Sequence, residues 1–186
     1  MEQEENKRKL VAAAQSLLEK SDSPERITSR AIAEEAGVNA AMINYYFRSK
    51  DNLLTEAVGE IISFSAERLK SPDKTKSPKE RLRAALWEIC EVVVRFRKFS
   101  KLFVPQILLN GKIEAPFYLL PDIREHFHGE KDEMECRVIA YEMISFLQLV
   151  FYRADEFCKY SGMDLMKQDD RKRLFDLQLD YFLPND

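Results

Sequence analysis

The chain has 186 residues, of which 45% are hydrophobic and 33% charged, with a net charge of −3 and a pI near 5.6. This size fits one ordinary domain, or a small domain beside a larger one, and the acidic balance excludes a protein that coats nucleic acid or membrane through bulk charge. Only 5 glycines and 7 prolines interrupt the chain. Long periodic segments with so few breakers predict an all-α fold.

Three cysteines, Cys90, Cys136 and Cys158, lie far apart and are odd in number. They form neither a metal-binding spacing nor a disulfide framework, which favours a reducing, cytoplasmic location. The charged start "MEQEENKRKL" is unlike a signal peptide, and no run approaches the roughly 18 apolar residues of a membrane span. We expect no membrane association, no metal and no cofactor.

The first predicted helix covers about residues 4–19, because its apolar residues recur at helical spacing on one face. Ser, Asp and Pro break the pattern in "EKSDSPERIT". Thr28 is a good N-cap for a short helix, "SRAIAEEA", and Gly37 ends that helix because glycine tolerates a left-handed turn. Asn39 is the next predicted N-cap and opens "AAMINYYF", and Ser49 caps a fourth helix that reaches about residue 69.

Two short helices joined by a tight turn containing glycine are typical of a helix-turn-helix. Its predicted inner face consists of Ile32, Ala33, Ala36, Val38 and Ile43. The outward positions of the second helix are then Asn39, Ala40, Ala41, Asn44, Tyr45 and Tyr46. Such a helix fits the major groove of B-DNA, where asparagine pairs with adenine and small residues approach a thymine methyl. Asn39 serving only as a cap, and the tyrosines serving only in packing, are the alternatives.

The flanks of this motif suit DNA phosphates. Thr28 and Ser29 offer hydroxyls beside free amides at a helix start, and the tyrosine hydroxyls can bond two more phosphate oxygens. Lys50 stands in the first turn of the fourth helix, where the helix dipole disfavours a cation unless an anion lies nearby. Phe47 is expected to turn inward as a core residue. Residues 26–50 have a net charge of only +2, so binding should depend strongly on salt and on dimer formation.

The remaining chain reads as helices with a polar connection in front. "KSPDKTKSPK" is that connection, and "SPKE" combines a capping box with proline at the first helical position. A long helix over 80–99 follows, then short or kinked helices over 102–120, a turn-rich connection over 121–133, and two helices over about 132–160 and 169–182. The histidines of "HFH" suggest a metal only weakly, since their loop position beside Gly129 is the simpler account.

The segment "ITSRAIAEEAGVNAAMINYYFRSKDNLLTEAV" resembles the N-terminal DNA-binding segment of TetR-family transcriptional regulators. The matching features span about residues 5–60 and include Thr28, the Ala36-Gly37-Val38 turn, the aromatic group ending in Phe47, and Lys50. The resemblance implies a three-helix DNA-binding domain over 1–50, a connecting helix over 50–70, and a ligand-binding and dimerisation domain over 77–186. It also implies that Arg30 reaches a guanine.

This chain departs from the family in its recognition helix. Asn39, Ala40 and Ala41 stand where the family often has serine or threonine, Asn44 replaces a common tyrosine, and Tyr46 a common histidine. These changes leave the docking mode intact but prevent any transfer of an operator sequence from relatives.

An apolar pocket between helices of the second domain would use its many aromatic residues, although core packing explains each of them equally well. The candidates for ligand contact are Trp87, Glu91, Arg95, Phe103, Phe117 and Tyr152. The helix predicted over 132–160 is apolar on two stripes, so it is buried on two sides, either inside its own subunit or in a four-helix bundle with a second copy.

The sequence and the resemblance together predict a homodimeric regulator, most simply a repressor that a small apolar or amphipathic ligand releases from a palindromic operator. A second hypothesis keeps the DNA-binding part but gives the C-terminal domain a protein partner in place of a small ligand. An enzyme is disfavoured, because no nucleophile is paired with a base and no glycine loop suits a phosphate.

Overall fold

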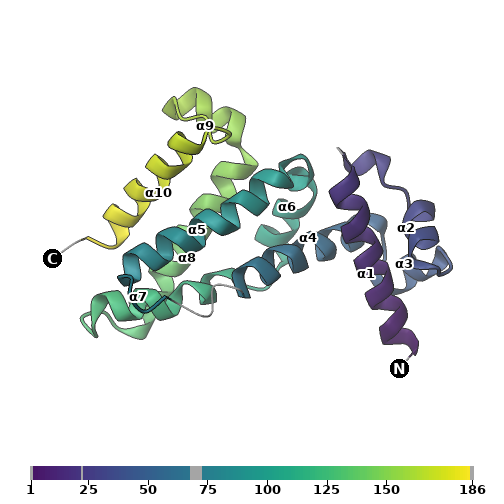
Figure 1. The fold of residues 1–186 in the computed structure, drawn as a ribbon, viewed down its shortest axis with the longest axis horizontal. Helices are drawn as coiled ribbons and strands as arrows, with labels where there is room; N and C mark the ends of the chain where they lie inside the picture. Colours follow the sequence, from purple (N-terminus) through teal and green to yellow (C-terminus); the bar gives the residue numbers. More distant parts are fainter. Residues whose placement is uncertain (1, 22, 68–72, 185–186) are drawn as a thin grey trace. The chain divides into compact units, whose positions relative to one another are not determined.

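The structure, a computed structural model, describes residues 2–21, 23–67 and 73–184, and these residues form helices and turns without any strand (Figure 1). The all-α prediction is therefore confirmed. The described chain falls into two compact units, the first built from Met1–Ile62 with Phe96–Asn110 and the second from Ser63–Arg95 with Gly111–Asp186.

The first unit begins with a long helix and continues with shorter ones. In chain order its elements are α1 (Glu2–Lys20), η1 (Pro24–Arg26), α2 (Ser29–Ala36), α3 (Ala41–Phe47), α4 (Lys50–Glu67) up to Ile62, η3 (Arg97–Phe99) and α6 (Ser100–Asn110). The predicted caps at Thr28 and Ser49 are confirmed, since the Ser49 hydroxyl accepts a hydrogen bond from the Asn52 amide at 3.1 Å. The predicted last turn of α4, residues 68–70, lies outside the described residues.

The core around the motif is mostly aliphatic, and α1, α2, α3 and α4 all contribute to it. Its fully buried side chains include Leu10, Leu18, Ile32, Ile43, Leu53 and Leu54. Phe47 is buried as expected, with 4% of its surface exposed, and the Lys7 ammonium sits 5.5 Å above its ring while pairing with Glu56 at 2.8 Å. Burying a side chain of this size stabilises the fold by about 1.5–3 kcal/mol, so the motif depends on this packing.

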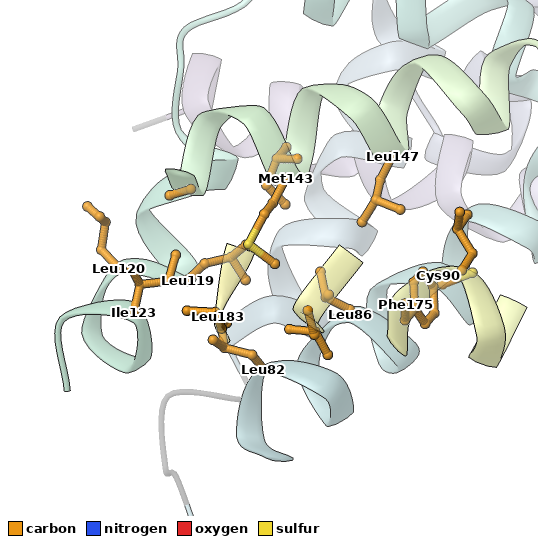
Figure 2. Close-up of a cluster of buried hydrophobic side chains, with 14 of the residues drawn as sticks. Leu82, Leu86, Cys90, Leu119, Leu120, Ile123, Met143, Leu147, Phe175 and Leu183 are labelled. Carbon is orange, nitrogen blue, oxygen red and sulfur yellow. The ribbon is translucent and has the colours of Figure 1, made fainter. Parts of the chain in front are cut away.

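The second unit is a larger helical assembly. Its elements are α5 (Pro78–Arg95), η4 (Ala115–Tyr118), α7 (Leu120–Phe127), α8 (Glu133–Tyr152), α9 (Ala154–Ser161) and α10 (Gln168–Phe182). Figure 2 shows its core, in which side chains from α5, α7, α8 and α10 point toward one another. Cys90 and Cys136 belong to this core, and burial raises the pKa of the Cys90 thiol to about 12.

Charged side chains are also buried in the second unit, and each has internal partners. Arg81 donates to Asp122 at 2.7 Å, to Glu125 at 2.6 Å and to the carbonyl of Lys76, which fastens α7 to α5. Arg171 donates to Glu91 at 2.7 Å and stacks over the Trp87 ring at 5.3 Å. These contacts offset the cost of burying the two guanidinium groups, although the Nε of Arg171 has no hydrogen-bond partner among the described residues.

The predicted turn-rich connection over 121–133 is wrong in its first half, where α7 forms. Pro121 lies in the first turn of α7, where a missing N–H costs nothing, and Leu120, Ile123 and Phe127 bury one face. Tertiary contacts, including those of Arg81, stabilise this eight-residue helix, which would be marginal alone.

Two further predictions need correction. The helix expected over 132–160 is interrupted at Arg153, which separates α8 from α9, and the helix expected over 80–99 ends at Arg95 before a 3₁₀ turn. The short helices predicted over 102–120 are confirmed in that α6 contains Pro105 and ends at Asn110. Within the described residues, every helix is too short or too polar to cross a bilayer.

Candidate nucleic-acid interface

The turn between α2 and α3 is built from local signals that the sequence displays. The Thr28 hydroxyl accepts a hydrogen bond from the Ala31 amide at 3.1 Å and so begins α2. Gly37 ends it with a φ of 65°, which a residue without a Cβ adopts freely, while the Val38 amide donates to the Ala33 carbonyl at 3.0 Å. Ile32 and Ala33 are buried beneath the turn, so α2 presents α3 in a fixed orientation.

The start of α3 distinguishes its two asparagines. The Asn39 side-chain oxygen accepts a hydrogen bond from the Ala41 amide at 2.8 Å, and the helix begins at Ala41, one residue later than predicted. Asn44 is exposed, and although its backbone carbonyl accepts from the Arg48 amide, its side chain has no hydrogen-bond partner within the described residues. Pairing with adenine uses both the oxygen and the nitrogen of an asparagine amide. Asn44 therefore has its full pairing capacity available, whereas Asn39 retains only its nitrogen.

The outward surface of α3 is small at one end and aromatic at the other. Ala40 and Ala41 are exposed, so a base edge can approach the backbone closely there. Tyr45 has 67% of its surface exposed and stands edge-on to Tyr46 at a centroid distance of 5.0 Å. This surface matches what a reading helix needs in the major groove.

Tyr46 lies differently from Tyr45. Its ring is half-buried and stands edge-on to Phe47 at 6.2 Å, and its hydroxyl is buried without a partner in the described part of the chain. A buried hydroxyl without a hydrogen bond costs free energy, typically about 1–3 kcal/mol. In this conformation Tyr46 packs within the motif, and its hydroxyl reaches a phosphate only if the ring turns outward.

Two residues that the sequence analysis did not single out, Arg48 and Asn52, shape the end of α3. Arg48 has a φ of 67°, a left-handed conformation that is uncommon for a residue with a Cβ. The Asn52 side chain donates to the Phe47 carbonyl at 2.8 Å and closes the helix. The two-residue connection between α3 and α4 was the available signal, because so sharp a reversal needs a residue with positive φ.

The start of α2 presents polar groups to solvent. The Thr28 hydroxyl uses its oxygen for the cap, and its hydrogen has no acceptor among the described residues. Ser29 is half-buried, and Arg30 is exposed with no ion pair within the described residues. Hydroxyls and free amides at a helix start are suited to a phosphate group.

Lys50 links the start of α4 to the turn before α2. Its ammonium donates to the Pro24 carbonyl at 3.1 Å and lies 3.8 Å from the Asp51 carboxylate, with 25% of the side chain exposed. An ammonium has three N–H groups, so this contact leaves donors for a further acceptor. The structure therefore places Lys50 close to both the Pro24 turn and the first turn of α4.

Comparison with known proteins is decisive at this point. Residues 10–57, which include α2, the turn and α3, match the family described as bacterial regulatory proteins, tetR family. These residues therefore form a DNA-binding segment of the tetR family, which indicates a DNA-binding transcriptional regulator.

The TetR fold extends over the whole chain. The chain is similar in structure to a TetR transcriptional regulator from Rhodococcus sp. RHA1, known from a crystal structure. The two superpose with a TM-score of 0.71 at 16% sequence identity, over 100% of this chain and 99% of the other. At that identity the likeness shows the fold alone. No curated protein matches the chain in sequence.

The six residues predicted to contact a ligand are distributed over both units of the chain. Phe103 is buried in the first unit, whereas Trp87, Glu91, Phe117 and Tyr152 belong to the second. Glu91 is engaged by Arg171, and Trp87 lies under that same guanidinium. Arg95 is exposed at the end of α5.

Two grooves on the second unit contain one predicted residue each. The α5–α10 groove, about 550 Å³, is lined by Trp87 and mostly by charged side chains, including the Arg83–Asp176 pair at 2.6 Å. The η4–α8 groove, about 920 Å³, is lined by Phe117 and mostly by apolar side chains. Glu91, Arg95, Phe103 and Tyr152 line neither groove.

Proposed function

We propose that this TetR-family regulator is a homodimeric repressor, acting in the cytoplasm, that binds a palindromic operator and is released by a small apolar or amphipathic ligand. Residues 1–50 bind the DNA, residues 50–70 connect the two domains, and residues 77–186 bind the ligand and dimerise. Two recognition helices enter successive major grooves, and the ligand favours a dimer whose helices are wrongly spaced.

The observation that supports the DNA-binding part is the outward surface of α3. Asn44 is exposed with an unengaged amide, and Ala40 and Ala41 leave room for a base edge. Thr28, Ser29 and Lys50 contact phosphates on either side, with Tyr45 beside them, and Arg30 adds a cation. Asn39 contributes through its side-chain nitrogen, since its oxygen accepts a hydrogen bond from the Ala41 amide, and Tyr46 contributes through its hydroxyl, which lacks a partner within the described residues. Specificity then resides in α3 and affinity in its flanks.

The support for a homodimer is a set of exposed apolar residues on α8 and α10, which we term the dimer seam: Phe146, Leu149, Tyr152, Leu177 and Tyr181. The opposite face of α8 is buried in its own subunit through Met143, Leu147 and Val150. A helix that is apolar on both faces packs on both sides. A two-fold pairing of α8 and α10 with a second copy forms the four-helix bundle.

The test combines a mass determination with DNA binding across a salt series, using DNA from just upstream of the gene and, failing that, sequences selected from random DNA. We expect a dimer whose affinity falls steeply as salt rises. Lys50→Ala should weaken binding to every sequence alike and reduce the salt slope by about 1, since one phosphate contact is lost. An unchanged slope for Lys50→Ala would show that the lysine serves only to hold the Pro24 turn.

The exposed apolar residues also support a second candidate, in which a different protein covers α8 and α10. The same mass determination separates the two, because a chain that stays monomeric at micromolar concentration leaves the dimer seam for another partner. Leu149→Glu should produce monomers if the seam joins two copies, and should leave the mass unchanged if it does not.

A further inference from the structure

The η4–α8 groove carries features that the proposed function leaves unused. Its lining includes buried Pro116 and Leu120 and the exposed apolar side chains of η4, of α8 and of the segment before η4: Ile113, Phe117, Met134, Val138 and Tyr141. At about 920 Å³ it falls in the usual size range of small-molecule sites. It lies along the first half of α8, whereas the dimer seam uses the second half.

One arginine at this groove is held in position by its neighbours. Glu133 accepts hydrogen bonds from Arg124 at 2.8 and 2.6 Å and from the Arg137 Nε at 2.6 Å. These two arginines lower the pKa of the Glu133 carboxyl to about 2, so it remains an anion. The Arg137 guanidinium also lies 5.7 Å from the centre of the Phe117 ring. Contacts on two sides thus fix its plane beside the apolar wall.

The N–H donors of Arg137 that have no partner in the described ranges indicate which kind of ligand can bind in the groove. Its Nε is engaged by Glu133, while its two terminal nitrogens have no hydrogen-bond partner among the described residues. Glu133 shares one negative charge between two guanidinium groups, so the cluster of Arg124, Glu133 and Arg137 has a net charge of +1. A guanidinium with free terminal nitrogens binds a carboxylate through two parallel hydrogen bonds.

The other charged residue of the groove lies at its opposite edge. Glu142 has no ion pair or hydrogen bond within the described part of the chain. It follows Arg137 by five positions along α8, which corresponds to roughly 140° around the helix. A carboxylate held at Arg137 is therefore kept away from Glu142, and an apolar body can extend between them along Met134 and Val138.

We infer that the η4–α8 groove binds an amphipathic organic acid, with its carboxylate on the terminal nitrogens of Arg137 and its apolar body against Phe117, Met134 and Val138. This inference rests on the proposed function, in that it names the chemical class of the ligand. It replaces Glu91 and Arg95 by Arg137 as the polar group that recognises the ligand.

The test is calorimetric titration of the full-length chain with two probes of equal chain length, decanoate and decylammonium, both below their micellar concentrations. Decanoate should bind at least about tenfold tighter than decylammonium, because hydrogen bonds to a charged group contribute about 1.5–3 kcal/mol. Arg137→Gln should weaken decanoate binding by about tenfold or more. Glu142→Gln, at the same groove, is the matched control and should leave it within about twofold.

Three results would overturn the inference: tighter binding of decylammonium, an unchanged decanoate affinity in an Arg137→Gln chain with a wild-type melting curve, or dissociation of dimers by Met134→Asp. The last result would show that a second copy covers the groove. Operator binding is measured separately. DNA binding without decanoate binding would refute the inference alone, whereas decanoate binding without operator release would support the site and refute ligand-driven release.

Discussion

The DNA-binding head, residues 10–57, and the second unit differ in whether their key polar side chains have partners within the chain. In the head, the core is apolar and the side-chain amide of Asn44 is left without a partner among the described residues. In the second unit, Arg81 and Arg171 are buried and engaged by carboxylates of their own chain. The head keeps hydrogen-bonding capacity for an external molecule, whereas the second unit uses its own to fasten helices together.

This difference indicates where to look for partners in either region. A polar group that is held in place yet lacks an internal acceptor or donor is available to something outside the chain. In the head that description fits Asn44, and in the second unit it fits the terminal nitrogens of Arg137. Substitutions that remove a polar group, or the packing beneath it, test this difference between the two regions.

The largest effect is expected from the packing under the reading surface. Phe47→Ala should destabilise the head by about 3–5 kcal/mol, because the cavity left by a buried aromatic ring collapses only partly. Operator binding should be lost with it, as measured by urea unfolding and gel shift. Phe64→Ala is the matched control, since 67% of Phe64 is exposed on α4. A Phe47→Ala chain that unfolds like the wild type would show that the head does not depend on this core.

Two arginines on α5 compare a buried ion pair with an exposed one. Arg81 has 7% of its side chain exposed and Arg83 has 44%, yet each contacts a carboxylate at 2.6–2.7 Å. Arg81→Ala should cost about 3 kcal/mol of unfolding free energy because it leaves Asp122 without its partner. Arg83→Ala should cost less than about 1 kcal/mol. Equal losses in urea unfolding would contradict the view that internal pairing fastens α7 to α5.

The two asparagines of the reading surface should separate recognition from stability. Asn44→Ala is expected to weaken binding to the preferred operator by about 2 kcal/mol while leaving binding to unrelated DNA almost unchanged. Asn39→Ala should instead lower the melting temperature, since the hydrogen bond from the Ala41 amide is lost, which costs about 1 kcal/mol. Competition gel shifts and thermal melts measure the two effects. A change of sequence preference in Asn39→Ala alone would reverse the assignment.

The smallest effect concerns the exposed cluster around Glu133. Hydrogen bonds from Arg124 and Arg137 lower its pKa from 4.5 to about 2, so the folded state favours the carboxylate. The stabilisation is fully present above pH 4.5 and is lost as the pH falls toward 2. Glu133→Gln should therefore lower the melting temperature at pH 7 and by less at pH 3. High salt should also shrink the difference at pH 7, because exposed charges are screened.

The elements of the head were predictable because short-range rules determine them. Thr28, Gly37 and Ser49 each fix a helix end through contacts within a few residues, and such signals are visible in a sequence. The left-handed Arg48 was missed because nothing in its identity announces a positive φ. The buried hydroxyl of Tyr46 was missed because outward and inward aromatic residues look alike along a short helix.

In the second unit the decisive contacts join residues far apart in the chain. Arg81 meets Asp122, 41 positions away, and Arg171 meets Glu91, 80 positions away. Such pairs leave no periodic pattern, so α7 was predicted to be a connection. Aromatic residues such as Trp87 and Phe117 were noticed, but their type does not reveal which of them faces a groove.

Because two of the three cysteines are buried, the third is a selective site for chemical labelling. Cys90 and Cys136 are enclosed in the core, where burial raises the pKa of each thiol and keeps the reactive thiolate scarce. Cys158, on α9, is partly exposed. A maleimide dye added to the folded wild-type protein should therefore react at α9 first, which supplies a fluorescent reporter on the second unit without any substitution.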